Sequence, residues 1–456
     1  MKIAFIHPDL GIGGAERLVV DAAVSLQEED NEVTIYTSHC DRTHCFEEVA
    51  NGTLHVEVCG DFFPTNIKGR LHIVFATLRQ LWLCLWLVFS GEIERYDMFV
   101  LDQLPYCLPL LHYNKRSDAK TLFYCHFPDQ LLASHASLVR SLYRKVFDTI
   151  EEFTTGCADE IVVNSKFTRS IFKKTFRSLA HITPQVIYPC VPTAVELEES
   201  SVKEVSTFLN GSDMFLSINR FERKKNISLA ILAFADLLSS LPEQKRSVLK
   251  LVLAGGYDAR VRENVEYLIE LEELCAKLQL KSITLRGNLS TYPKDRNVFF
   301  LPSVTSDLKD SLISQCQILL YTPSFEHFGI VPLEAMRQGK IVLATDTGGP
   351  LETVENFSAE SKSWTGFTIS SDHIEWSAVM NQVLQMDPQT KADAGERAKK
   401  RVYVMFSRKS MQLRFLETFE IMRPKRFSYE PYLAQTVKIR FIFYALFAYY
   451  ISQSLT

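Results

Sequence analysis

Short apolar runs alternate with helix-like patterns from the start of the chain, and this alternation constrains the fold more than any other feature. Residues 2–6 (KIAFI) form a mostly apolar run, and residues 15–27 carry apolar side chains at the spacing of a helix. Strand-like runs then recur between helical stretches, as EVTIYT, MFVLD, KTLFYC and EIVVNS. Strands that alternate with helices are typical of a parallel sheet covered on both faces. The pattern therefore predicts a doubly wound α/β domain.

A second alternating series follows a break in the pattern. Residues 192–212 are acidic and rich in serine, and the strand-like runs then resume as MFLSIN, LKLVLAGG, SITLRG, CQILLYTP and KIVLAT. A chain of 456 residues is too long for one ordinary core. We therefore expect two doubly wound domains, at residues 1–200 and 205–422, and a basic and apolar tail at 423–456.

Composition and charge exclude several classes of protein. The chain is 46% hydrophobic, which fits a globular protein, and its net charge of −4 gives no basic excess for nucleic acid. None of the ten cysteines forms a CxxC pair, and most lie in apolar runs such as LWLCLW. That pattern predicts buried, reduced thiols and argues against a disulfide framework or a zinc site. The apolar run in MKIAFIHPDLG is shorter than that of a secretion signal.

A glycine-rich turn follows the first strand, in the sequence HPDLGIGGAERLVVDAA. Backbone N–H groups at such a turn, helped by the dipole of the following helix, can bind an anion. Gly11 and Gly13 fit the GxGxxG dinucleotide motif, but its sixth position is Glu16, whose carboxylate would crowd a pyrophosphate. The turn therefore argues against a nicotinamide enzyme. A plain strand-to-helix turn is the alternative interpretation.

Polar residues also follow two later strands. Four cations lie where a strand gives way to a helix, in the sequence SINRFERKKN: Arg220, Arg223, Lys224 and Lys225. Cations at that position can clamp a diphosphate, and arginine can do so in a bidentate fashion. His126 lies at the carboxyl end of another strand, in FYCHFPD, and ligands of open α/β sheets bind at that end. A solvated basic loop and a structural histidine are the alternatives.

The most specific stretch is SFEHFGIVPLEAM, residues 324–336, which is apolar but carries two carboxylates. Gly329 and Ile330 are predicted to start a helix whose N–H groups face a phosphate. Glu334 would lie one turn into that helix, where it can bind a ribose hydroxyl, and Glu326 would precede the helix in a loop. Two buried carboxylates without partners would be costly, so we expect both to hold ligand hydroxyls beside a diphosphate. This stretch predicts a nucleotide-sugar site.

The spacing of the two glutamates resembles the E-x7-E motif of the family-four retaining glycosyltransferases, which have the GT-B fold. The glycine loop, the strand-end histidine and the basic cluster occur in that family's order, up to about residue 420. The resemblance implies two Rossmann-like domains that face a central cleft. It also implies that Glu326 and His126 contact the transferred sugar, Glu334 the ribose, and Arg220, Lys225, Gly13 and Gly14 the leaving diphosphate.

Within that family, the sequences around these motifs are similar to mannosyltransferases of the dolichol pathway. This resemblance implies retaining transfer of mannose from GDP-mannose to dolichol-diphosphate-linked Man1GlcNAc2 and Man2GlcNAc2, through α-1,3 and α-1,6 linkages. It places the enzyme at the cytosolic face of the endoplasmic reticulum and allows for a complex with other mannosyltransferases of the pathway. No cofactor is implied, and no metal, because no Asp-x-Asp motif lies near these residues. One set of motifs implies a single site for both linkages, with the acceptor near His126, Phe127 and Asp129.

Two apolar segments fall outside the alternating pattern. Residues 71–89 are long enough to cross a bilayer, but a central Arg79 would cost about 2.5–3.5 kcal/mol there. Crossing would also put the glycine loop and His126 on opposite sides of the membrane. The run 441–451 is too short to cross. We therefore expect both segments to lie in the cytosolic leaflet, with the basic residues of 423–440 on anionic headgroups.

Three alternatives remain open from the sequence. A nucleotide-sugar epimerase of the same fold would need no lipid acceptor, and the two apolar segments argue against it. Another lipid-linked glycosyltransferase of this fold is the second alternative. A degenerate transferase that acts as a scaffold would be expected to lose a donor-site residue, yet the chain keeps all four: Glu326, Glu334, Lys225 and Arg220.

Overall fold

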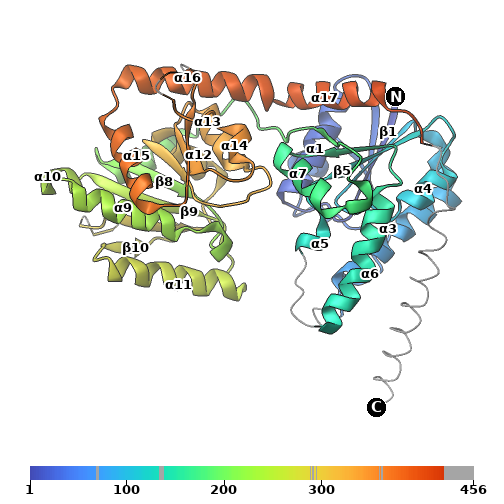
Figure 1. Cartoon of the computed structure of the whole chain (residues 1–456), viewed down its shortest axis with the longest axis horizontal. Coiled ribbons are helices and arrows are strands. Elements are labelled where there is room, and N and C mark those ends of the chain that lie inside the picture. The colour runs from blue at the N-terminus through green and yellow to red at the C-terminus, as the bar shows by residue number, and fades with distance from the viewer. Residues whose placement is uncertain are drawn as a thin grey trace, which may run out of the picture. The chain divides into compact units, whose positions relative to one another are not determined.

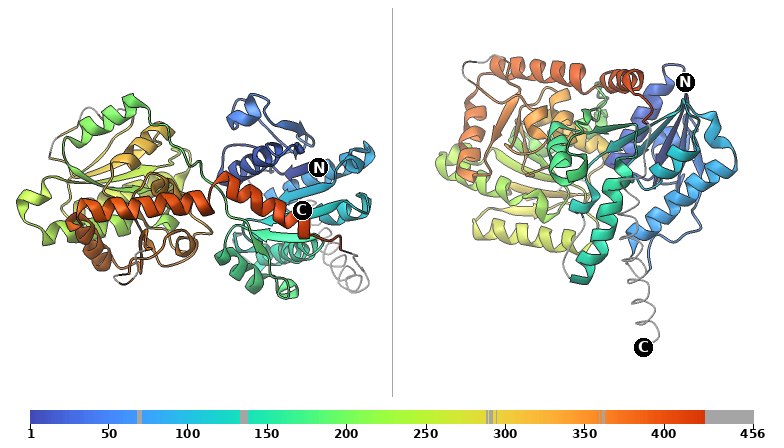
Figure 2. Two further views of the ribbon diagram at one scale, coloured as in Figure 1. Left: turned by 90° about the horizontal axis from the view of Figure 1, so that it is seen from above. Right: turned by 45° about the vertical axis from the view of Figure 1, so that its right-hand side comes forward.

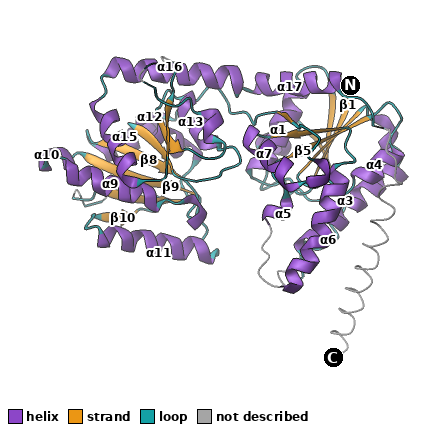
Figure 3. Ribbon diagram, in the orientation of Figure 1, coloured by secondary structure: helices purple, strands orange, loops and turns teal. Residues whose placement is uncertain are grey.

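The chain forms two compact α/β units. The computed structural model describes residues 1–67, 71–132, 138–287, 289, 292–293, 295–358, 360 and 363–425. Of the described residues, the first unit comprises those of 1–188 and 411–425, and the second comprises those of 189–410. In the described part of the chain each unit has one seven-stranded sheet, with helices on both faces (Figures 1 and 3). The doubly wound α/β fold predicted from the sequence is therefore confirmed.

The strands of the first sheet run parallel in the order β3-β2-β1-β4-β5-β6-β7. The order reverses between β1 and β4, and ligands of open α/β sheets bind outside the carboxyl ends of the strands at such a point. The elements of this unit before its last helix are β1 (Lys2–His7), α1 (Gly14–Gln27), β2 (Glu32–Thr37), α2 (Glu47–Ala50), β3 (His55–Val58), α3 (His72–Phe89), η1 (Glu92–Arg95), β4 (Met98–Asp102), α4 (Leu108–Asn114), β5 (Lys120–Cys125), α5 (Asp129–Leu132), α6 (Leu138–Thr155), β6 (Glu160–Val163), α7 (Lys166–Thr175), η2 (Arg177–Leu179) and β7 (Gln185–Val186).

The central strands of this sheet are buried on both sides. Every residue of β4 is buried, as are five of the six residues of β5, and both strands read as continuous apolar runs because helices cover both faces. The cysteines take part in this burial across the chain. All ten lie in the described residues, none of them forms a disulfide, and seven are buried, as the sequence predicted.

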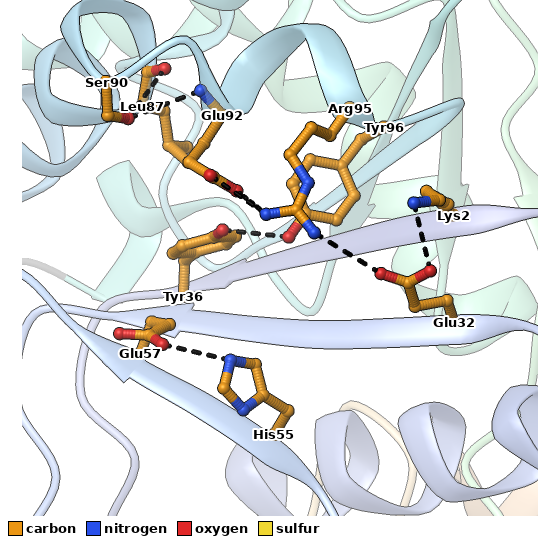
Figure 4. A network of polar contacts seen from close by, with 10 residues as sticks. All are labelled: Lys2, Glu32, Tyr36, His55, Glu57, Leu87, Ser90, Glu92, Arg95 and Tyr96. Carbon is orange, nitrogen blue, oxygen red and sulfur yellow. Dashed lines mark hydrogen bonds and ion pairs between the residues drawn. The ribbon is translucent and has the colours of Figure 1, made fainter.

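A polar network fixes the segment between α3 and β4 against the first two strands (Figure 4). The hydroxyls of Tyr36 and Tyr96 lie 2.9 Å apart in the interior. Burial and the hydrogen bond with Tyr96 raise the pKa of Tyr36. At the amino ends of β1 and β2, Glu32 pairs with Lys2 at 3.2 Å and with Arg95 at 3.8 Å. These exposed ion pairs lie at the amino ends of the strands, opposite to the carboxyl ends where a ligand would bind.

Helix α3 is half-buried and amphipathic. Of the described helices, it alone is long and apolar enough to cross a membrane by length and composition, with a mean hydropathy of 1.6, and 28% of its residues are buried. Two of its polar residues are buried: Arg79 donates to the Phe63 carbonyl at 2.8 Å, and Gln80 donates to the Leu104 carbonyl at 2.6 Å. A neighbouring face of the helix exposes large apolar side chains at helical spacing: Leu78, Trp82, Trp86 and Phe89. The predicted apolar run at 441–451 lies outside the described residues.

The strands of the second sheet also run parallel, in the order β10-β11-β9-β8-β12-β13-β14. Here the order reverses between β8 and β12. The elements are α8 (Glu199–Leu209), β8 (Asp213–Ile218), η3 (Arg223–Lys225), α9 (Ser228–Ser240), α10 (Glu243–Arg246), β9 (Leu249–Gly255), α11 (Arg262–Lys277), β10 (Ser282–Thr284), β11 (Val298–Pro302), α12 (Ser306–Gln315), β12 (Ile318–Tyr321), α13 (Ile330–Arg337), β13 (Val342–Thr345), α14 (Pro350–Thr353), β14 (Gly366–Ile369), α15 (His373–Gln385) and α16 (Pro388–Met405).

The last described helix, α17 (Arg408–Ile421), returns to the first unit (Figure 2). The sequence analysis assigned residues 205–422 to the second domain, whereas most of this helix packs on the first. The side-chain amide of Gln412 donates to the Ser25 carbonyl. Phe415 is fully buried, with its ring stacked on Tyr124 at a centroid distance of 6.3 Å. Burial of its apolar side chains against the first sheet explains why the helix belongs there.

Candidate functional site

Three side chains meet at the carboxyl ends of β1, β4 and β5: His7, Asp102 and His126. Nε2 of His126 lies 3.0 Å from Oδ2 of Asp102, and Nδ1 of His7 lies 2.7 Å from Oδ1. The side chain of Asp102 is 2% exposed and that of His126 is 20% exposed. The predicted His126 therefore lies beside the point where the strand order reverses. The sequence analysis missed the other two residues, although each is a polar residue that ends an apolar strand.

The hydrogen-bond partners of His7 fix its charge. Nδ1 faces the carboxylate of Asp102, and Nε2 lies 2.9 Å from the carbonyl oxygen of Asp9. Both partners only accept, so both ring nitrogens carry hydrogen and His7 is an imidazolium. Burial acts to lower the pKa of His7, but attraction to Asp102 outweighs it and raises the pKa to about 10. Burial acts to raise the pKa of Asp102, but the two histidines lower it overall.

The glycine loop is partly filled by its own glutamate. A Cβ atom on Gly13 would come within 2.2 Å of Oε2 of Glu16, whereas a Cβ on Gly14 would meet open space. Glu16 also lies 3.9 Å from Nε2 of His7. Burial acts to raise the pKa of Glu16, but the nearby His7 imidazolium and the backbone of Glu16 itself lower it overall. Gly13 therefore makes room for a carboxylate, which explains why this turn departs from the dinucleotide motif.

The predicted acceptor-side residues Phe127 and Asp129 lie just beyond β5. The Asp129 carboxylate accepts a hydrogen bond from Arg144 at 2.6 Å, and its backbone N–H donates to Glu151 at 2.7 Å. Arg144 and Glu151 are both buried and belong to α6. Burial raises the pKa of Glu151 to about 8. The sequence analysis missed both residues, which lie in a helix without a recognisable motif and hold Asp129 in place.

In the second unit, the loop after β8 carries the predicted basic cluster. Nζ of Lys225 donates to Oε1 of Glu326, which lies in the loop after β12. The side chain of Arg220 is 67% exposed. Arg223 turns instead toward α11, where it pairs with Glu270 at 2.5 Å. The strand order therefore brings Lys225 and Glu326 together at the second reversal point, while Arg223 takes no part.

Helix α13 begins at Ile330, as predicted. Gly329 precedes it with a φ of +85°, in the left-handed region that favours glycine, and a Cβ there would lie 3.1 Å from the hydroxyl of Tyr321. Glu334 lies one turn into the helix and accepts a hydrogen bond from Nζ of Lys309, on α12, at 2.6 Å. The Glu334 side chain is 15% exposed, so an incoming ligand can reach it.

Both carboxylates of the 324–336 stretch have partners in the ligand-free protein, so the sequence argument that they would lack partners is wrong. Glu326 pairs with Lys225, and Glu334 pairs with Lys309. Lysines satisfy these charges at neutral pH without any hydroxyl ligand. Lys309 was missed because its sequence, SDLKDSL, forms part of an ordinary polar helix.

A pair of glycines supports the loop that carries Glu326. The N–H of Gly349 donates to the carbonyl of Glu326 at 2.8 Å, and a Cβ on Gly349 would come within 2.0 Å of the Phe328 carbonyl oxygen. A Cβ on Gly348, where φ is +74°, would lie 2.4 Å from the carbonyl oxygen of Glu326. The two backbones touch, and side chains would separate them. The signal for this contact is the Gly-Gly pair in DTGGP, which the sequence analysis left unused.

The predicted residues thus form one group in each unit. The first combines a histidine with a buried carboxylate. The second combines exposed and half-buried cations with two carboxylates at the amino end of a helix, an arrangement suited to a diphosphate flanked by hydroxyls. Within the described ranges, no group of three or more His, Cys, Asp and Glu side chains could hold a metal ion.

Two family models match the chain in succession. The model described as Glycosyltransferase Family 4 matches residues 12–195. The model described as Glycosyl transferases group 1 matches residues 199–401.

Several named relatives are similar over most of the chain. The alpha-1,3/1,6-mannosyltransferase ALG2 of Debaryomyces hansenii is 53% identical over 426 residues, which cover 91% of this chain and 90% of that protein. The ALG2 of Candida albicans is 53% identical, with coverage of 90% and 96%. The ALG2 of Saccharomyces cerevisiae is 47% identical over 442 residues, with coverage of 94% and 86%.

Solved structures of glycosyltransferases are similar in fold. HepE from Anabaena, in complex with UDP, has a TM-score of 0.64 and 19% identity, and the match covers 92% of this chain and all of HepE. Sucrose-phosphate synthase from Thermosynechococcus elongatus has a TM-score of 0.68 and 18% identity, with coverage of 92% and 98%. At these identities the likeness concerns the fold alone, and it confirms the GT-B fold.

Proposed function

This chain belongs to the family of the ALG2 alpha-1,3/1,6-mannosyltransferases, and on that basis we propose that it transfers mannose from GDP-mannose to dolichol-diphosphate-linked Man1GlcNAc2 and Man2GlcNAc2. The observation that carries the proposal is 53% identity to the Debaryomyces hansenii protein over 91% of this chain. Mannosyl transfer follows from the family. We propose in addition that the donor carries a guanine nucleotide and that the acceptor is linked to a lipid.

The geometry of the second unit supports a diphosphate donor. Arg220 and Lys225 supply two positive charges on the loop after β8, and the N–H groups at the start of α13 supply a positive dipole end. When the donor binds, Lys225 exchanges Glu326 for the diphosphate, and Glu326 becomes available to a mannose hydroxyl. Charge that develops on the leaving GDP is then stabilised by cations already in place. Glu334, held by Lys309, binds the ribose.

The chain carries one such group of donor residues, so one site makes both linkages. The donor binds at the same place in both steps because the protein has one set of residues for its ribose and its diphosphate. The acceptor must therefore rotate between steps to present a second hydroxyl. His126, Phe127 and Asp129 form the acceptor side, and Arg144 keeps the Asp129 carboxylate in a fixed position.

We also propose that the protein works on the cytosolic face of the endoplasmic reticulum membrane, with α3 lying in the lipid surface. The exposed face of α3 gathers Trp82, Trp86 and Phe89, and the ring of Phe62 packs edge-on against Trp82 at 5.2 Å. Tryptophan is favoured at membrane interfaces. Arg79 lies one turn before Trp82 on the same side of the helix, but its side chain is buried and donates to the Phe63 carbonyl, so its charge is not presented to the lipid.

The membrane proposal is tested by flotation of the purified protein with vesicles that contain anionic lipid. Trp82→Glu with Trp86→Glu should abolish flotation, whereas Tyr403→Glu, which changes an exposed aromatic residue of α16, should leave it unchanged. Equal flotation of both variants would contradict the role of α3.

Product analysis tests the proposed reaction. Detergent-purified protein is incubated with GDP-mannose and a short lipid-linked Man1GlcNAc2, and product masses are followed over time. We expect products larger by one and then two hexoses, with linkages assigned by linkage-specific α-mannosidases. UDP-glucose should give no transfer. Transfer from UDP-glucose, or none from GDP-mannose by a folded protein, would refute the proposed donor.

A further inference from the structure

Asp102 is shared between two histidines and sealed from solvent. Each of its oxygens faces one ring, His7 at 2.7 Å and His126 at 3.0 Å. The side chain of His7 is fully buried, so it can touch no substrate. A buried charge is costly unless it is paired, and these two residues pair with each other. Any effect of His7 on catalysis must therefore pass through Asp102.

The contact with Asp102 decides which nitrogen of His126 carries hydrogen. The ionised carboxylate only accepts, so Nε2 of His126 is the donor. Nδ1 is then the nitrogen left for a ligand, and it has no hydrogen-bond partner among the residues that the structure describes. The ring is also held from one side by Tyr124, at a centroid distance of 4.8 Å.

His7 determines how strongly Asp102 attracts a second proton onto His126. A carboxylate facing a single imidazole stabilises its protonated form. In this protein the other oxygen of Asp102 already faces the His7 imidazolium. The positive charge of His7 compensates the carboxylate, so Asp102 attracts a proton onto the His126 ring less strongly. A neutral His126 offers a lone pair at Nδ1, whereas a protonated ring would offer a hydrogen.

We propose that the buried His7–Asp102 ion pair is a positioning device that holds His126 with its hydrogen on Nε2 and with Nδ1 presented as an acceptor to a substrate hydroxyl. The proposal rests on the proposed mannosyl transfer for the identity of that hydroxyl. The titratable groups on the elements around His126 are Asp102 on β4, His7 on β1, Glu16 on α1, Tyr124 on β5, Asp129 on α5, and Arg144 and Glu151 on α6.

The two members of the pair should affect the pH dependence in opposite directions. In His7→Gln the charge of Asp102 is no longer compensated, so His126 takes up a proton more readily and the acid limb of the kcat profile moves to higher pH. In Asp102→Asn the attraction disappears and the acid limb moves to lower pH. Asp102→Asn should also lower kcat by about 10- to 100-fold, the range found when the orienting partner of a metal-binding histidine is removed.

A matched control separates positioning from stability. Asp159 is another fully buried carboxylate of the first unit, paired with Lys115 at 3.3 Å, and it lies at the amino ends of β5 and β6. Asp159→Asn should lower the melting temperature without moving the acid limb. Unshifted profiles in folded His7→Gln and Asp102→Asn would overturn the proposal.

A substrate-free measurement tests the same device if a variant does not fold. Nitrogen NMR of histidine-labelled wild-type protein reports which ring nitrogen of His126 carries hydrogen. We expect hydrogen on Nε2 alone at neutral pH, and hydrogen on Nδ1 would refute the proposal. Because this readout needs no substrate, failure of the positioning device and failure of the proposed mannosyl transfer can be told apart.

Discussion

Lys225 and Glu326 form one ion pair in the ligand-free protein, and removal of either partner should change GDP binding in opposite directions. If Lys225 must leave Glu326 to reach the diphosphate, Glu326 competes with GDP for the same cation. Lys225→Ala removes the contact with the diphosphate. Glu326→Gln removes the competitor and also a negative charge near the phosphates.

The magnitudes follow from the chemistry and exposure of the pair. A charge-assisted hydrogen bond contributes about 1.5–3 kcal/mol, so Lys225→Ala should weaken GDP binding by about 10- to 150-fold. The side chains of Lys225 and Glu326 are 17% and 25% exposed, and a solvent-accessible ion pair is worth about 0.2–1 kcal/mol. Glu326→Gln should therefore strengthen GDP binding, by at most about fivefold, while transfer of mannose is lost.

Isothermal titration with GDP, beside an assay of mannose transfer, separates the two effects. Arg223→Ala is the matched control, because Arg223 lies on the same turn but pairs with Glu270 on α11. It should bind GDP almost as the wild type does. The reasoning would be refuted if Glu326→Gln weakened GDP binding as much as Lys225→Ala, or if Lys225→Ala bound GDP normally.

Four further outcomes are expected. Glu334→Ala should abolish transfer. Lys309→Ala should raise the KM for GDP-mannose several-fold with a smaller loss of kcat, because the Glu334 carboxylate loses its orienting partner. Equal KM values in Lys309→Ala and wild type would argue against this role of Lys309. Asp129→Ala should change the ratio of two- to three-mannose products in a time course, whereas donor-site variants should depress both steps together. The pKa of His7 is raised to about 10 from a usual 6.5, so the contribution of protonated His7 to the stability of the folded protein is complete below about pH 6.5 and is lost as the pH rises through 10. Urea unfolding should therefore show that the free energy of unfolding falls above neutral pH. This fall should be flatter in His7→Gln.

Local signals in the sequence predicted most strands of both sheets and some of the residues in each of the two candidate groups. Strands buried on both faces read as apolar runs, and a polar residue at the end of such a run marked His126. Strands β3, β7 and β14 were not predicted; β3 is half-exposed, and β7 has two residues. The run VFFLP of β11 was present in the sequence but was not used.

Contacts set by strand order could not be read from the sequence. Asp102 lies 95 residues from His7, and they meet because β4 is placed next to β1. Lys309 meets Glu334 because α12 and α13 pack together around β12. Motif spacing within one segment carries no information about either partner. The sequence analysis therefore predicted the site residues but not the side chains that hold them in place.

The return of α17 to the first unit has a consequence for biosynthesis. The second unit is a continuous stretch of chain, 189–410, and can fold as soon as it leaves the ribosome. The first unit must wait for its final helix, which brings Phe415 to Tyr124, the residue whose ring lies against His126. A nonsense codon at Met411 would therefore spare every predicted donor and acceptor residue and still leave an exposed apolar face for quality-control factors to recognise. Conversely, co-expression of a fragment ending at residue 410 with a separate α17 peptide should restore the first unit by complementation.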